Sequence, residues 1–220
     1  MHDYDLAVAR LGALFGLVPL EENSVLDPAV GRRGGMAWVG DGSIEIGESI
    51  VDDGAVDRFI KRFGPGHHSL GVQVRDLDVT MAHLDGLGVA TVARPEPFFC
   101  FTDPRATEGL LLEWCDGELD IDPHFGAEVP ATETEPLVPI DAMAFIGAAM
   151  PDPHGSANTL ADLFGTSVTF SAADDTGPVA GVSVGDCTLA IWPSDERARL
   201  TTLGLRTPSL DEAGVTLSSA

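Results

Sequence analysis

The sequence predicts an α+β protein built from a repeated βαβββ unit, in which one strand and one helix are followed by three more strands. Three pairs of similar segments indicate the repeat, and a similar offset along the chain separates the members of each pair. The segments are "ARLGALFGL" (9–17) and "NTLADLFGT" (158–166), "WVGDGSIEI" (38–46) and "SVGDCTLAI" (183–191), and "SLGVQVRDLD" (69–78) and "TLGLRTPSLD" (202–211). The pairs therefore indicate an ancestral unit that has been duplicated.

The second unit of the repeat shows the complete order of elements. Hydrophobic periodicity and turn residues predict a strand over 68–74, a helix over 78–87 closed by Gly88, and a short strand over 90–93. Two more strands are expected over 98–101 and 109–114.

We expect a pair of units in 1–116, an acidic proline-rich linker in 117–139, and a degenerate third unit with part of a fourth in 140–220. Met1 falls just before the first helix, so the opening strand of the first unit is missing from this sequence. The fourth unit stops after its helix begins. Three explanations stay open: a truncated chain, a misassigned start, or strands supplied by neighbouring chains.

The charge of the chain limits its partners. Thirty-five acidic residues stand against 12 basic ones, for a formal net charge of -23. Such a surface repels nucleic acid and anionic membranes, so we expect a small-molecule partner. No apolar run approaches the roughly 20 residues of a membrane helix, and we expect a cytoplasmic protein. The 3 cysteines fit no zinc motif and are expected as free thiols.

The βαβββ repeat, "HSLGVQVRDLD" (68–78) and "FTDPRATEGLLLEW" (101–114) resemble the vicinal oxygen chelate superfamily. This superfamily holds glyoxalases, methylmalonyl-CoA epimerases, extradiol dioxygenases and antibiotic-resistance binding proteins. The last segment is most similar to the epimerase branch. The resemblance implies rolled mixed sheets formed by paired units, the first and last of them incomplete here.

Members of the superfamily that bind metal place a histidine on the first strand of a unit and a carboxylate or glutamine on its fourth strand. The resemblance maps these positions onto a residue before Met1, then Glu45, Ser69 and Glu113. In the second half it maps them onto Ala142, Ala190 and Thr202, which cannot hold a metal in this manner. Because serine is a poor ligand, we expect one divalent ion to bind weakly or not at all.

The adjacent histidines His67 and His68 are assigned to opposite faces of the strand by its alternation. His68 shares a face with apolar residues and is expected in the core. His67 shares the other face with Ser69 and Gln73, which suits the ligand cavity.

The two glutamates differ in their surroundings. Glu113 follows three leucines and precedes Trp114, and a carboxylate in so apolar a run should be paired, metal-bound or shifted in pKa. The structural alternative is an ion pair with Arg105 of the same hairpin. Glu45 has a simpler alternative, a solvated carboxylate on a half-exposed strand.

Two glycine-rich segments, "GRRGG" (31–35) and "GDG" (40–42), are predicted to be turns rather than phosphate loops, because neither lies between a strand and a helix. Arg32 and Arg33 could bind an anionic substrate tail, although a solvated loop is the simpler interpretation.

We expect an isomerase or lyase that acts on a small carbonyl or acyl-thioester substrate by proton transfer. Glu113, Glu45 and His67 are the expected catalytic residues and the expected ligands of any bound metal, and Ser69, Gln73 and Arg105 are the expected substrate contacts. A metal-free small-molecule-binding or resistance-type protein is the alternative, and an extradiol-type dioxygenase ranks last. A missing opening strand would expose a sheet edge, so we also expect a homodimer.

Overall fold

The structure is a computed structural model that describes residues 3–20, 25–27, 31–118, 120–132, 135–175 and 177–208. It has α+β architecture with helices, one antiparallel sheet and two mixed sheets, as the sequence predicts. The chain divides into two compact units, which differ from the expected halves. Unit 1 contains the described residues of 1–66, 118–144 and 205–220, and unit 2 contains 67–117 and the described residues of 145–204. The segment expected as a linker thus belongs almost entirely to unit 1.

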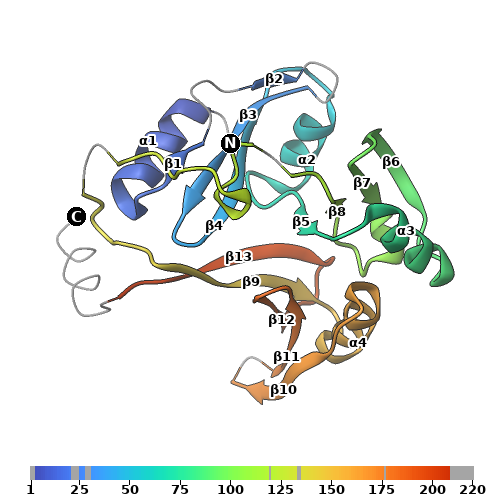
Figure 1. Ribbon diagram of the computed structural model, residues 1–220. Coiled ribbons are helices and arrows are strands. Elements are labelled where there is room, and N and C mark those ends of the chain that lie inside the picture. Colours follow the sequence, from blue (N-terminus) through green and yellow to red (C-terminus); the bar gives the residue numbers. More distant parts are fainter. Residues whose placement is uncertain are drawn as a thin grey trace. The chain divides into compact units, whose positions relative to one another are not determined.

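Unit 1 is an antiparallel sheet with α1 packed on one face (Figure 1). Asp3 caps the first turn of α1 by accepting a hydrogen bond from the backbone N–H of Leu6, and Gly16 ends the helix at a φ of 73°. Buried side chains of α1 contact those of the sheet, among them Ala37 and Ile46. The elements of this unit are α1 (Tyr4–Phe15), β1 (Val18–Pro19), β2 (Val25–Asp27), β3 (Arg32–Val39), β4 (Gly42–Ser49) and α2 (Ala55–Phe63).

Two features of unit 1 differ from expectation. The predicted turn "GDG" does join β3 to β4, but "GRRGG" was predicted wrongly, because Arg32 to Gly35 pair with β4 as the start of β3. Helix α2 was not predicted at all. Its apolar residues follow the helical spacing of Val56, Phe59, Ile60 and Phe63.

The first repeat of unit 2 has the predicted βαβββ order, with boundaries that move by a few residues. Its strands lie in the order β5-β8-β7-β6, and β5 runs parallel to β8. The elements are β5 (Leu70–Gln73), α3 (Leu77–Gly86), β6 (Thr91–Glu96), β7 (Phe99–Thr102), η1 (Pro104–Ala106) and β8 (Leu112–Cys115).

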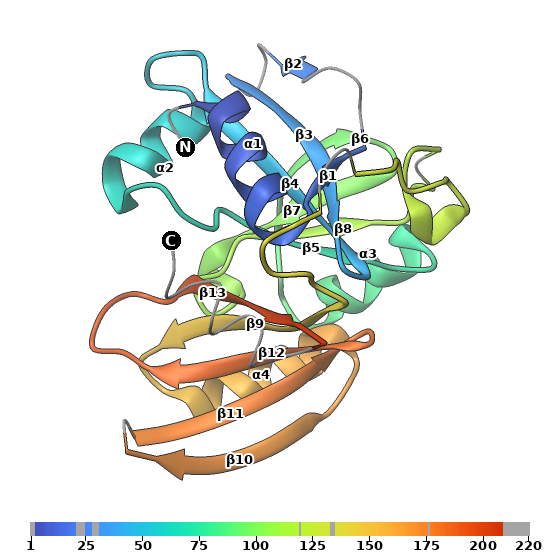
Figure 2. The ribbon, with the colours of Figure 1, turned by 90° about the vertical axis from the view of Figure 1, so that its left-hand side faces the viewer.

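The second repeat of unit 2 has the same topology. Its strands lie in the order β10-β11-β12-β9, again with the first strand parallel to the fourth, and β13 (Arg199–Arg206) lies beside β9 (Figure 2). The helix expected after β13 falls outside the described residues. The other elements are β9 (Ala142–Met150), α4 (Pro153–Phe164), β10 (Val168–Asp174), β11 (Gly177–Val184) and β12 (Cys187–Pro193).

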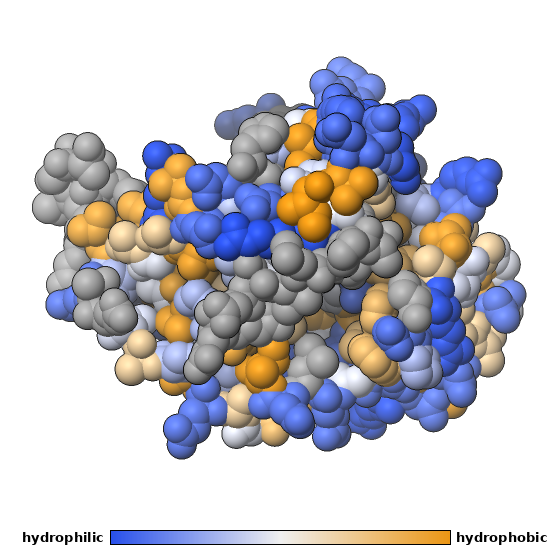
Figure 3. All heavy atoms as spheres, turned by 90° about the horizontal axis from the view of Figure 1, so that it is seen from above, coloured by the Kyte–Doolittle hydropathy of each residue, from blue (hydrophilic) through white to orange (hydrophobic). Residues whose placement is uncertain are grey.

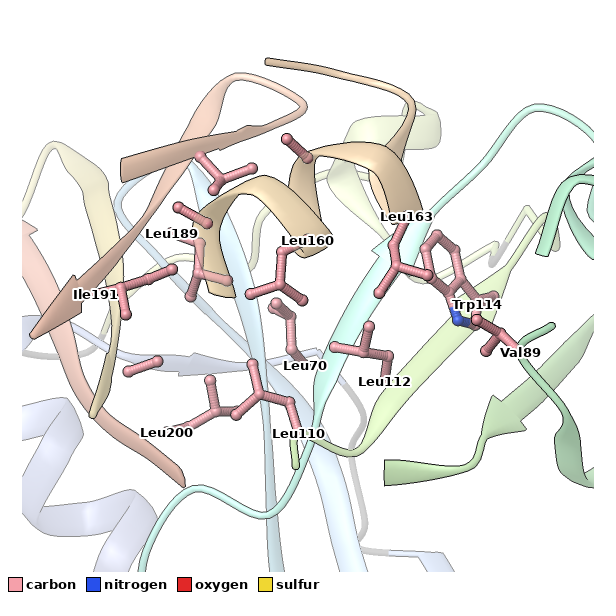
Figure 4. Close-up of a cluster of buried hydrophobic side chains, with 14 of the residues drawn as sticks. Leu70, Val89, Leu110, Leu112, Trp114, Leu160, Leu163, Leu189, Ile191 and Leu200 are labelled. Atoms are coloured by element: carbon pink, nitrogen blue, oxygen red, sulfur yellow. The ribbon is translucent and has the colours of Figure 1, made fainter. Parts of the chain in front are cut away.

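One hydrophobic core joins the two repeats of unit 2. Leu160 and Leu163 of α4 point into it together with Leu70 and Leu112 of the first repeat (Figure 4). Trp114 contacts Phe164, with ring centroids 5.7 Å apart and the rings tilted by 49°. The alternating residues of each fourth strand therefore face a helix layer, and the intervening residues face away from it.

The segment expected as a linker packs against unit 1. The backbone N–H of Val138 donates to the carbonyl of Leu14 at 2.8 Å, and the Val138 side chain is 4% exposed. The segment also contains a short helix, η2 (Pro123–Phe125). Its proline content predicted the lack of regular structure but not its contacts.

Hydrophilic side chains cover much of the face shown in Figure 3, with hydrophobic residues between them. Within the described ranges, every helix is too short or too polar to cross a membrane.

Candidate functional site

The outward face of the first sheet in unit 2 carries Glu113. On β8 the side chains alternate, so Leu112 and Trp114 are buried in the core while Glu113 and Cys115 are only partly buried on the other face. Gly71 and Gln73 of the parallel strand β5 share this outward face. Glu113 is thus not turned into the helix-packing layer.

The neighbours of Glu113 leave room for a ligand. It lies between Gly71 on β5 and Phe101 on β7, which are its partners in the sheet register. A Cβ atom built at Gly71 would meet no other atom within 4 Å. Glu113 therefore has an open position beside it on β5 and an aromatic residue beside it on β7.

Two further side chains line this face. The Gln73 side-chain amide donates weakly to the carbonyl of Gly117, at 3.4 Å. Burial raises the pKa of the Cys115 thiol above its ordinary value, and the nearby Glu113 charge raises it further. Cys115 is therefore protonated at neutral pH and is a poor nucleophile.

The structure corrects the prediction for His68. Strand β5 begins at Leu70, so the alternation assumed for the two histidines does not extend to them, and both residues are exposed. His68 is not a core residue. Although much of the His67 surface is exposed, part of its imidazole is desolvated, and this lowers the pKa of His67 below its ordinary value, so that the neutral imidazole dominates at pH 7. Ser69 is partly buried and directly precedes β5.

Glu45 lies on the outward face of β4 in unit 1, with Ile44 and Ile46 directed at α1. Its carboxylate pairs with Arg32 of β3. Because Glu45 and Glu113 belong to different units, their predicted convergence stays a prediction.

The remaining arginines singled out in the sequence are also paired. Arg33 contacts Asp5 at 2.7 Å and Glu48 at 3.2 Å. Arg105 is held by Asp103, with its Nη2 atom 2.6 Å from the Asp103 carboxylate. Its side chain is otherwise exposed, so its predicted contact with substrate stays a prediction.

The described residues form no cluster of metal ligands. Across the part of the chain that the structure describes, no three His, Cys, Asp or Glu side chains lie where they could hold one ion. Arg32 already neutralises Glu45, and Ser69 offers only a neutral hydroxyl.

The second repeat carries no acid at the position of Glu113. Ala190 lies there, opposite Gly147 in the same register that places Glu113 opposite Gly71. The register also corrects one mapped position: Phe145, two residues before Gly147, corresponds to Ser69, whereas Ala142 lies three residues earlier.

A second constellation lies in unit 1 and was missed in the sequence. His124 of η2 contacts Trp38 of β3, with ring centroids 4.9 Å apart at 63°. Nδ1 of His124 is 2.8 Å from the Asp122 carboxylate. The motif Asp-Pro-His was visible in the chain, but nothing local indicated its contact with Trp38.

The fold of the whole chain is similar to that of 4-hydroxymandelate synthase, a vicinal oxygen chelate enzyme. A variant of this enzyme from Streptomyces coelicolor matches 100% of this chain and 72% of its own with a TM-score of 0.73, at 14% identity. The chain therefore has the fold of this superfamily, as its resemblance predicted.

Methylmalonyl-CoA epimerases match about half of the chain. The enzyme from Mycobacterium tuberculosis covers 55% of this chain and 85% of its own, at 21% identity and a TM-score of 0.49. A variant from Streptomyces coelicolor in complex with 2-nitronate-propionyl-CoA covers 51% and 85%, at 22% identity and a TM-score of 0.46. No protein-family model matches the sequence, and neither does any curated protein.

Proposed function

We propose that the protein is an enzyme that moves a proton next to a carbonyl group of a small substrate, with Glu113 as the base. The observation that carries this proposal is the position of Glu113 on an outward sheet face, beside the open space over Gly71. A carboxylate so placed can reach a bound carbon acid, whereas the same residue in the helix layer could not.

Removal of the proton needs one base. Glu113 takes the proton from the carbon beside the carbonyl, and the electron pair of the broken C–H bond forms an enolate. Delivery of a proton to the opposite face by a second acid, which water can supply, gives an isomerase, and departure of a β-substituent with its electron pair gives a lyase. Phe101, the register partner of Glu113 on β7, adds an apolar residue beside the base.

The substrate class is a small carbonyl compound or acyl thioester. Solved epimerases bind methylmalonyl-CoA and its analogues, which makes acyl thioesters the first probes to test. Gln73 is the polar side chain nearest along β5 on the same face and is proposed to contact the acyl group.

Deuterium exchange tests the proposal directly. We expect wild-type protein in D₂O to replace the proton beside the carbonyl of methylmalonyl-CoA or of a 2-oxo acid, followed by ¹H NMR. Glu113→Gln should slow the exchange about 100-fold or more. Glu96→Gln, a matched change at an exposed position of the same sheet, should leave it unaltered. Equal exchange by wild type and Glu113→Gln would refute the role of Glu113.

A metal-free binding protein is the second candidate. It is favoured by the Arg32–Glu45 ion pair, which neutralises a carboxylate that a metal-dependent enzyme would need. Saturable binding of the acyl thioester without any deuterium exchange, unchanged in Glu113→Gln, would support this function over the enzyme.

We further propose that a divalent ion binds weakly at most. Calorimetry with Mn²⁺ and Zn²⁺ on wild type and on Ser69→His tests this, since an added imidazole should strengthen Zn²⁺ binding if Glu45 and Glu113 converge on it. Tight stoichiometric binding by the wild type would contradict the proposal.

We retain the homodimer as part of the proposal. Light scattering at micromolar concentration should give twice the chain mass of 23.0 kDa. A monomer under these conditions would contradict it.

A further inference from the structure

The outward face of the unit 1 sheet carries a row of side chains that the proposed reaction does not use. Trp38 and Met36 alternate with the core residues of β3, and Glu45 faces Met36 across the strand pair. Arg32 lies four residues before Met36 on the same face of β3. Its guanidinium pairs with the Glu45 carboxylate. His124 covers the Trp38 end of the row.

Asp122 determines which nitrogen of His124 carries the proton. Its carboxylate is nearly buried and lies 2.8 Å from Nδ1 while also accepting the backbone N–H of His124 at 2.9 Å. Because a carboxylate only accepts hydrogen bonds, Nδ1 of the neutral ring is the donor. Nε2 is then left with its lone pair as a hydrogen-bond acceptor.

The row is accessible to a ligand. The side chains of His124 and Glu45 are 51% and 43% exposed, and Trp38 and Met36 are partly exposed. Diagonal neighbours such as Trp38 and Glu45 have Cβ atoms about 7–8 Å apart, which is roughly the length of one substituted aromatic ring. An indole, a thioether and an imidazole acceptor are thus grouped within the reach of a small planar molecule.

The charge of the surroundings disfavours an anionic ligand. The chain as a whole has a formal net charge of -23, and the Arg32–Glu45 ion pair leaves no net charge of its own on this face to attract an ion. An acceptor at His124 Nε2 calls for a ligand with a hydrogen-bond donor, and the Trp38 and Met36 surfaces suit an aromatic ring.

We propose that this face of unit 1 is a binding site for a neutral aromatic ring that donates one hydrogen bond, through a hydroxyl or a ring N–H, to Nε2 of His124. The site uses residues of unit 1 alone and does not depend on Glu113. Asp122 acts as a positioning residue, because it holds the imidazole in the tautomer that accepts.

Two matched pairs of probes test the donor. The hydroxyl pair is p-cresol and 4-methylanisole, and the N–H pair is indole and 1-methylindole; in each pair a methyl group removes the donor. Binding is followed through the indole N–H resonances of ¹⁵N-labelled protein, with the Trp38 signal assigned by Trp38→Tyr. We expect the Trp38 signal to shift and at least one donor probe to bind about five- to tenfold tighter than its methylated partner.

Variants of His124 test the acceptor. His124→Phe keeps a ring against Trp38 but has no nitrogen, so the preference for the donor probe should vanish. His124→Gln should keep part of it through the side-chain oxygen. His154→Phe, an exposed histidine of unit 2, serves as the control and should bind like wild type.

Three results would overturn the proposal. These are no shift of the Trp38 signal by any probe at 10 mM, equal binding within both pairs, or a preference that survives in His124→Phe. The indole N–H spectrum also shows whether a variant is folded. If His124→Phe does not fold, the preference of His124→Gln for the donor probes tests the proposal instead.

Discussion

The two repeats of unit 2 have the same topology and differ in what lies on their outward faces. In each, a glycine of the first strand pairs in parallel with a residue of the fourth strand. Gly71 is opposite Glu113 in the first repeat, and Gly147 is opposite Ala190 in the second. The backbone frame is thus the same, while the acid is present in only one of them.

The two repeats also differ in the space over the glycine of the first strand. The next outward residue along each fourth strand explains this difference. In the second repeat it is Trp192, and a Cβ built at Gly147 would come within 2.5 Å of its ring and 2.9 Å of the Thr202 side chain. In the first repeat it is Cys115, whose small side chain leaves the space over Gly71 open. Phe145 contacts Trp192, with ring centroids 5.8 Å apart, and fills the outward face of the second repeat further.

The comparison shows which residues hold the fold and which are available for chemistry. Helix-facing residues of both repeats share one hydrophobic core and tolerate little change. Outward residues are released from that constraint by the alternation of the strand. One repeat has filled this face with aromatic rings, and the other presents a carboxylate beside open space.

The largest losses of stability are expected at positions where the two repeats are alike. Leu112→Ala and Leu189→Ala should each lower the free energy of unfolding by about 2–5 kcal/mol, because both side chains are fully buried on the helix side of a fourth strand. Urea denaturation measures both. A loss below about 1 kcal/mol for only one of them would show that the two positions are not equivalent.

Glycine substitutions should separate the two outward faces. Gly147→Ala should lower stability by about 1–3 kcal/mol, since the new methyl group meets Trp192 and Thr202. Gly71→Ala should leave stability unchanged or raise it by up to about 1 kcal/mol. Thermal unfolding of the two variants provides the measurement, and similar losses would mean that the space over Gly71 is filled.

The thiols of the first repeat are expected to have a smaller effect, on how stability changes with pH. Burial raises the pKa of Cys100 and of Cys115, so the native state keeps both protonated above about pH 8.5, where the unfolded chain ionises. Their contribution to stability is complete below that pH and is lost as the pH rises through the raised native values. Urea denaturation at pH 7.5 and 9.5 should show a smaller loss for Cys115→Ser than for wild type. Identical losses would contradict the shift at Cys115.

The smallest effect on stability is expected at His67. In the second repeat, Met143 occupies the corresponding position. Burial lowers the pKa of His67, so its contribution to stability is present above about pH 6.5 and is lost as the pH falls toward the lowered native value. NMR titration should show one imidazole that protonates below the ordinary range and disappears in His67→Gln. Titration of that signal at or above pH 6.5 would rule out the effect of burial.

Predictions from the sequence succeeded where local rules act alone. The run "LLLEWC" assigns Leu112 and Trp114 to one face and Glu113 to the other, because the alternation of a strand is a property of its covalent geometry. Helix α1 ends at Gly16 for a similar reason, since glycine readily adopts the left-handed conformation found there. Helix α2 could have been predicted from the spacing of its apolar residues.

Predictions failed where a strand boundary or a partner distant in the sequence determines the conformation of a residue. His68 was assigned to the core because the strand was expected to include it, and β5 begins two residues later. "GRRGG" contains residues typical of turns, but pairing with β4 satisfies its backbone hydrogen bonds and extends β3 through Arg32.

The sequence by itself determined the repeat, the order of the elements and the face on which Glu113 lies, because hydrophobic periodicity and turn residues act over a few neighbouring positions. Only the tertiary structure decided that Arg32 neutralises Glu45, that Trp192 covers Gly147, and that His124 lies against Trp38. These contacts join residues of different elements. Their formation depends on how strands and connecting segments pack, which no local pattern encodes.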